Sequence, residues 1–74
     1  MSFNLADPVT VLKNIPGEGV RFLDVGFVVH IYGNHEAYTV EFCDPSGVVT
    51  GLATEDANWF SKYEPISVKR QKQH

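Results

Sequence analysis

Hydrophobic and polar residues alternate along residues 37–43, a pattern typical of a half-buried β-strand. One set of alternate positions is apolar and comprises Tyr38, Val40 and Phe42. The other set comprises Thr39, Glu41 and Cys43. Because successive side chains of a strand point to opposite faces, we expect Val40 and Phe42 in the core.

A second alternation runs through residues 25–32, where every odd position is apolar: Val25, Phe27, Val29 and Ile31. The even positions hold Gly26, Val28, His30 and Tyr32. A glycine inside a strand indicates a bulge or a close backbone approach, and a bulge at Gly26 would exchange the two faces on one side of it. We therefore place Val29 and Ile31 in the core and leave Val25 and Phe27 open.

Turn-forming residues separate these strands from their neighbours. Gly33 and Asn34 readily adopt left-handed conformations, so residues 24–42 are predicted to form a β-hairpin. Residues 44–47 (Asp-Pro-Ser-Gly) match a type I turn and predict a second hairpin. Three further short strands are expected at residues 7–12, 48–54 and 60–68, a loop at 14–19 and one 3-10 turn at 54–60.

These elements predict an all-β fold, a small barrel of about five strands, because a strongly bent sheet closes its own edges. We expect one domain over residues 1–68 and a basic, flexible tail over residues 69–74. The chain has 74 residues, of which 43% are hydrophobic and 20% charged, as in ordinary globular domains. A domain of this size has a small core, so it gains stability from good packing or from oligomerisation.

Charge and cysteine content limit the possible functions. Residues 1–68 hold three basic against nine acidic residues, a net charge of −6, while Lys69, Arg70 and Lys72 make the end basic. The acidic body disfavours nucleic-acid binding. With one cysteine, Cys43, no internal disulfide can form, and the absence of a signal-like or membrane-spanning segment predicts a cytoplasmic protein.

Candidate catalytic groups are few. His30, His35 and Glu36 lie near one hairpin but lack the spacing of a metal or acid–base site, and polar residues are ordinary in a turn. Cys43 has no basic neighbour that would lower the pKa of its thiol. We therefore expect no enzymatic activity, no cofactor and no metal.

The aromatic residues are more informative, because nine of them exceed what so small a core can bury. Exposed tyrosine and tryptophan are common anchors of protein interfaces. We predict a partner-binding surface on the second face of the hairpin, extended by aromatic residues of the C-terminal part. It comprises Phe27, Val28, His30, Tyr32, Thr39, Glu41, Trp59 and Tyr63.

Residues 24–42 (DVGFVVHIYGNHEAYTVEF) resemble strands of the SH3-like barrel superfamily, in which a D-x-G-x-V-V strand follows a loop rich in proline and glycine. They resemble more closely a family of small bacterial proteins of unknown function with D-V-G-x-V-V and A-Y-x-V-E-F motifs. Matching positions are Asp7, Val9, Leu12, Ile15, Pro16, Gly19, 24–29, Tyr32, 36–38, 40–42, Asp44 and Gly47. Leu23 and Phe27 stand where this family usually has glycine and threonine. The resemblance implies a small barrel and a bacterial origin, and it implies no catalytic residue.

Three functional hypotheses follow. The first is a non-enzymatic protein-interaction module that forms a homo-oligomer and contacts its partner through exposed aromatics and an unpaired strand edge. A variant is an inhibitor or immunity-type protein whose acidic body docks on a basic enzyme. The alternative is a small RNA-binding barrel, which would use Lys69, Arg70 and Lys72.

Overall fold

The computed structural model describes residues 2–64 and folds them into one five-stranded antiparallel sheet. The strands are β1 (Pro8–Val11), β2 (Val25–Tyr32), β3 (Ala37–Cys43), β4 (Val49–Glu55) and β5 (Phe60–Lys62). Their order in the sheet is β4-β3-β2-β1-β5. The predicted all-β fold of about five strands is confirmed. The part of the predicted 60–68 strand beyond residue 64 and the predicted tail at 69–74 lie outside the described residues.

Two 3-10 turns are present where one was expected: η1 (Pro16–Glu18), in the connection between β1 and β2, and η2 (Ala57–Trp59), before β5. Asp56 caps η2 by accepting a hydrogen bond from the Asn58 amide at 2.9 Å. Thr54, the first residue of the expected turn, lies within β4. The turn therefore begins later than expected, at the Asp56 cap.

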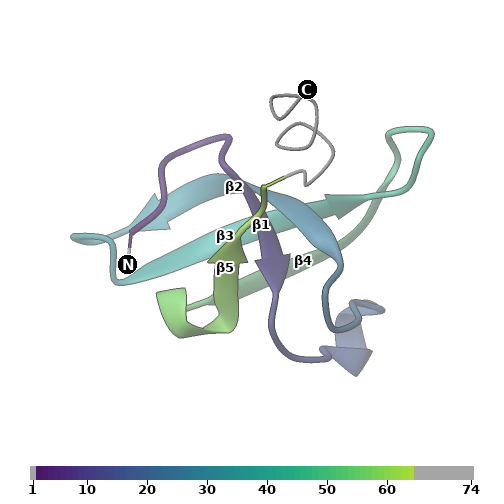
Figure 1. Ribbon diagram of the computed structural model, residues 1–74, viewed down its shortest axis with the longest axis horizontal. Coiled ribbons are helices and arrows are strands. Elements are labelled where there is room, and N and C mark those ends of the chain that lie inside the picture. Colours follow the sequence, from purple (N-terminus) through teal and green to yellow (C-terminus); the bar gives the residue numbers. More distant parts are fainter. Residues whose placement is uncertain (1, 65–74) are drawn as a thin grey trace, which may run out of the picture.

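The sheet bends so that its two ends face each other across the core. In Figure 1, β1 and β5 lie in front of β3 and β4 and run across them, while the long strand β2 belongs to both layers. The core between them is built from Phe3, Val9, Val11, Val20, Val28, Tyr38, Val40, Phe42, Ala53 and Phe60. The N-terminal segment adds to it, because the Phe3 amide donates to the Tyr38 hydroxyl at 3.2 Å.

The turn between β3 and β4 forms where the sequence predicts it. The Gly47 amide donates to the Asp44 carbonyl at 2.9 Å. The Asp44 carboxylate also accepts hydrogen bonds from the Ser46 hydroxyl at 2.6 Å and from the Val48 amide at 3.0 Å. These bonds favour the ionised carboxylate, the Ser46 hydroxyl most of all, and hold the pKa of Asp44 below its ordinary value of 3.8.

A β-bulge in β2 reverses the predicted faces of that strand. Val28 pairs with Val40, but the next pair is His30 with Thr39, so Val29 is an extra residue. As a result Val28 is 1% exposed and Val29 is 45% exposed. The predicted core position of Val29 and the predicted surface position of Val28 are both wrong, whereas Ile31 packs against the core as expected.

Gly26 is required by the space around it and is not the site of the bulge. A Cβ atom there would lie 2.6 Å from Val40 Cγ1 and 2.9 Å from Phe42 Cδ1. The close approach predicted from this glycine is therefore confirmed. The bulge follows three residues later, at Val29, which explains why the two faces exchange after Val28 instead of before it.

Candidate partner-binding surfaces

One row of side chains crosses the solvent side of three neighbouring strands. Phe27 in β2 pairs with Glu41 in β3, and Glu41 pairs with Leu52 in β4. Directly opposed residues of antiparallel strands share a face, so these three side chains lie beside one another. Phe27 is 49% exposed and Leu52 45%, while Glu41 is half-buried. The row therefore presents a carboxylate between two apolar groups.

Further residues extend this row along the strands. Cys43 pairs with Val49 on one side of it, and His30 pairs with Thr39 on the other. Val29 joins the solvent side through the bulge. We call this surface the outer face: Phe27, Val29, His30, Tyr32, Thr39, Glu41, Cys43, Val49, Leu52 and Thr54.

A chain of hydroxyl groups orders the polar part of the outer face. The Tyr32 hydroxyl and Thr39 Oγ1 lie 2.9 Å apart, and Thr39 Oγ1 and Thr54 Oγ1 lie 2.8 Å apart. The His30 ring meets the Tyr32 ring edge to face, with 4.4 Å between centroids. These contacts restrict the rotamers of Tyr32 and His30, so both side chains are ordered within the domain itself.

The structure brings five of the eight predicted site residues together on the outer face: Phe27, His30, Tyr32, Thr39 and Glu41. Val28 does not belong to it, because the bulge turns this side chain into the core. Tyr63 lies after β5, where its amide donates to the Pro8 carbonyl at 3.0 Å, and Pro8 is paired with Phe27. Tyr63 thus continues the Phe27 row towards the β5 edge.

The prediction missed Val29, Val49 and Leu52, which are exposed apolar members of the outer face. The alternation in residues 48–54 is obscured by two adjacent valines and by Gly51. A sequence signal was nevertheless present for Leu52, because the small residues Gly51 and Ala53 flank it. Both of these are buried, which leaves Leu52 on the solvent side.

A second exposed cluster lies where β1 ends and where β2 and β5 begin. The Leu12 amide donates to the Trp59 carbonyl and the Leu23 amide to the Val11 carbonyl, both at 2.8 Å. These bonds bring residues from three distant parts of the chain to one end of the sheet. We call this surface the loop end: Leu12, Lys13, Arg21, Phe22, Leu23 and Trp59.

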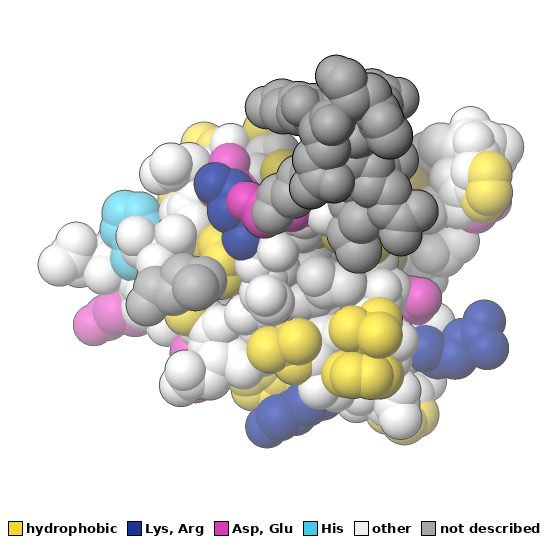
Figure 2. All heavy atoms as spheres, viewed as in Figure 1, with side chains coloured by type: hydrophobic (Ala, Val, Ile, Leu, Met, Phe, Trp, Pro, Cys, Tyr) yellow, Lys and Arg dark blue, Asp and Glu magenta, His cyan; other side chains and the backbone are white. Residues whose placement is uncertain are grey.

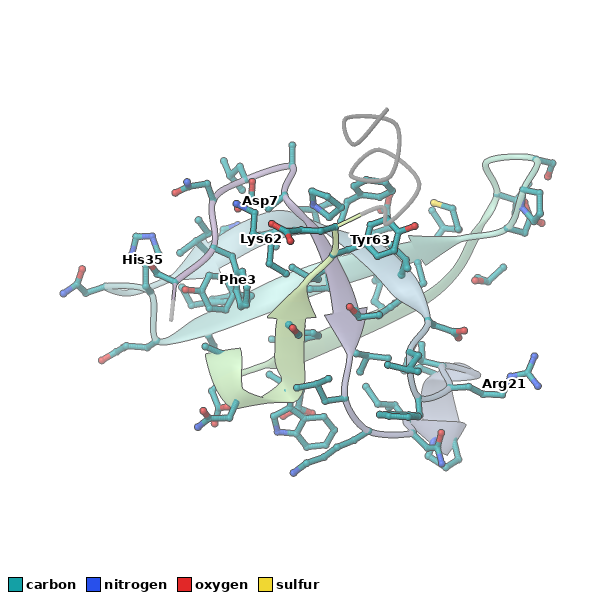
Figure 3. The ribbon with its side chains drawn as sticks, in the orientation of Figure 1. Phe3, Asp7, Arg21, His35, Lys62 and Tyr63 are labelled. Carbon is teal, nitrogen blue, oxygen red and sulfur yellow. The ribbon has the colours of Figure 1, made fainter. Side chains whose placement is uncertain are left out.

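The loop end combines apolar side chains with positive charge. Phe22 is 55% exposed and Leu23 54%. Trp59, the remaining predicted site residue, is half-buried, and Lys13 Nζ lies 4.5 Å from the centre of its ring. Figure 2 shows yellow hydrophobic side chains flanked by dark-blue basic ones in its lower part, and Figure 3 shows Arg21 projecting from this end.

Leu23 occupies an unfavourable backbone conformation with φ of 73°. The left-handed region costs a residue with a Cβ about 1–2 kcal/mol, a cost that glycine avoids. Neighbouring hydrogen bonds impose this turn: the Arg21 amide donates to the Asp24 carboxylate at 2.9 Å and the Phe22 amide to Asn14 Oδ1 at 2.8 Å. The backbone is therefore strained at a residue whose side chain is largely in water.

With the geometry of both surfaces established, comparison with known proteins places the chain in a family. A family model described as "Domain of unknown function (DUF4926)" matches residues 5–60. The chain belongs to this family. Searches of curated proteins and of solved structures found no match. The match includes the whole of β1–β4, and with them the outer face, and it confirms the expectation that the chain belongs to a family of unknown function.

The other candidate groups of this DUF4926 chain stay apart. His35 meets Tyr38, with 6.1 Å between ring centroids, whereas His30 contacts Tyr32 on the outer face. Within residues 2–64 we find no group of three or more histidine, cysteine, aspartate or glutamate side chains arranged to hold a metal. The same part of the chain contains no pocket, and none of its helices is long enough to cross a membrane.

Proposed function

We propose that this protein is a non-enzymatic interaction module that associates with other copies of itself through the outer face. One observation carries the proposal: the outer face exposes five large apolar side chains in neighbouring positions, namely Phe27, Val29, Tyr32, Val49 and Leu52. Exposed large apolar side chains gathered on one face, with polar groups among them, are typical of contact sites.

The character of the outer face also supports binding to a protein. Phenylalanine and tyrosine contribute strongly at interfaces because they bury large areas. The hydroxyl chain through Tyr32, Thr39 and Thr54 supplies polar groups that are already ordered. A domain with a small core also gains stability when a second copy binds its folded form, by mass action.

Light scattering coupled to size-exclusion chromatography tests the proposal, using wild type and Leu52→Ser over a range of concentrations. Burial of a fully exposed leucine contributes roughly 1.5–3 kcal/mol and Leu52 is 45% exposed, so the variant should raise the dissociation constant about three- to tenfold. Val48→Ser is the matched control, because Val48 is equally apolar and exposed but lies in the turn before β4. A wild type that stays monomeric up to about 1 mM would contradict self-association.

The RNA-binding alternative and the inhibitor-type variant have distinct outcomes in the same assay. The alternative relies on Lys69, Arg70 and Lys72, which lie outside the described residues. The outer face, as defined within residues 2–64, holds Glu41 and no lysine or arginine, which disfavours phosphate there. Added single-stranded RNA that co-elutes with a monomer would favour the alternative, and a monomer that binds a basic enzyme would favour the inhibitor.

A further inference from the structure

We infer that the loop end of one copy docks on the outer face of a second copy, in a head-to-tail contact. This inference rests on the proposed self-association and specifies its geometry. The two surfaces lie on different parts of the sheet, the outer face on β2–β4 and the loop end beside β1 and β5. One copy can therefore use both at once.

Charge distinguishes this arrangement from a symmetric dimer. The outer face has Glu41 between Phe27 and Leu52. A two-fold contact of this face with itself would bring two such carboxylates together, and a two-fold contact of the loop end would oppose Lys13 and Arg21 with their own copies. Head-to-tail docking instead sets Lys13 and Arg21 against Glu41, and complementary charges favour that pairing.

Lys13 and Arg21 give the loop end a larger share of basic residues than the rest of residues 1–68. They are two of the three basic residues in positions 1–68, which otherwise hold nine acidic ones. The nearby carboxylates of Asp24 and Asp56 accept hydrogen bonds from backbone amides of their own turns. The loop end as defined holds Lys13 and Arg21 and no acidic side chain, so these two cations can face Glu41 of another copy.

The strained Leu23 gives an independent reason to expect a contact at the loop end. Its left-handed backbone would be free of strain with glycine, and its exposed side chain contributes little in the isolated domain. Burial against Phe27 and Leu52 of a neighbour would make the leucine favourable. Phe22, exposed beside it, would be buried by the same contact.

Charge reversal provides the sharpest test, because it changes exposed side chains and leaves the core intact. Arg21→Glu and Glu41→Lys should each weaken self-association at least about tenfold, since each opposes like charges. An equimolar mixture of the two variants should associate again, as should the double variant, because both restore opposite charges. Lys62→Glu is the control: Lys62 pairs with Val9, on the side of the sheet opposite to Phe27, and should leave association unchanged.

The outcomes separate the inference from the proposed function. If wild type associates but Arg21→Glu associates equally well, or if the mixture of variants stays monomeric, the head-to-tail contact is wrong while self-association stands. A monomeric wild type refutes both. Leu23→Gly gives a second measure: its melting temperature as a monomer should stay within about 4 °C of wild type, while its dissociation constant rises about tenfold. Unchanged association of this variant would also overturn the inference.

Discussion

Truncation of two adjacent valines tests the bulge in β2 directly. Val28 and Val29 are the same residue type in the same strand, so their intrinsic strand preferences cancel when Val28→Ala is compared with Val29→Ala. They differ in environment, because Val28 is fully buried and Val29 lies half in solvent. A regular strand that kept Ile31 on the core without a bulge would place Val29 in the core and Val28 in solvent, and would give the reverse ranking.

The expected effects follow from burial. Val28→Ala removes two methyl groups from the core, about 1.6 kcal/mol at roughly 0.8 kcal/mol each. The cavity left between Val28 and Val40 raises the loss to about 2–3 kcal/mol. Val29→Ala removes the same atoms from a partly exposed site, where losses of about 0.5 kcal/mol are usual. The two variants should therefore differ by about 2 kcal/mol.

Urea unfolding measures this difference, with the fluorescence of the one tryptophan, Trp59, as the signal. A domain of 74 residues has a free energy of unfolding of about 4–11 kcal/mol, so Val28→Ala should remain folded enough to measure. Its melting temperature should fall by about 10–20 °C. Equal losses in the two variants, or a larger loss for Val29→Ala, would refute the register through the bulge.

Three other changes test the core and the turn. Gly26→Ala should cost about 1–3 kcal/mol in urea unfolding because its Cβ has no space, whereas Gly17→Ala, with nothing within 4 Å, should not show a packing loss. Tyr38→Phe leaves a buried amide, that of Phe3, without an acceptor, and should cost about 1–3 kcal/mol and speed hydrogen exchange there. The lowered pKa of Asp44 contributes stability that is complete above 3.8 and is lost as the pH falls through the lowered value. In Asp44→Asn, the free energy of unfolding should therefore fall less steeply than in wild type as the pH is lowered from 4. An unchanged pH dependence would contradict this linkage.

Local chemistry accounts for what could be predicted from sequence. Tyr38, Val40 and Phe42 are all buried, as their alternation indicated, because β3 is paired on both sides and one of its faces covers the core. The turn that begins at Asp44 was also predictable, since the groups that form it lie within five residues of one another. Patterns of this short range do not depend on the rest of the fold.

The position of the bulge depends on how β2 pairs with β3, and the sequence of β2 alone does not indicate it. Both Val28 and Val29 are apolar, so alternation cannot tell which of them faces the core. Gly26 suggested an irregularity, but a glycine is needed there because the Val40 and Phe42 side chains leave no space for a Cβ atom. The error was therefore one of position within the strand.

The loop end could not be predicted from local sequence. It forms because β1 pairs with β2 on one side and β5 on the other, which joins residues near positions 12, 22 and 59. The left-handed conformation of Leu23 carries no sequence signal either, because leucine is a poor choice there. Only the three-dimensional arrangement shows that a strained, exposed leucine stands beside Arg21.

The same irregularity that preserves the core also builds the surface. With one residue inserted after Val28, both flanking halves of β2 keep an apolar side chain on the core, Val28 before the bulge and Ile31 after it. The inserted Val29 has to face solvent, and it adds to the apolar outer face next to His30 and Tyr32. Among residues 2–64 the large exposed apolar side chains are about as numerous as the buried hydrophobic ones. A small core thus coexists with two exposed apolar surfaces, one around Glu41 and the other beside Lys13 and Arg21, and this distribution is the basis of the proposed association of copies.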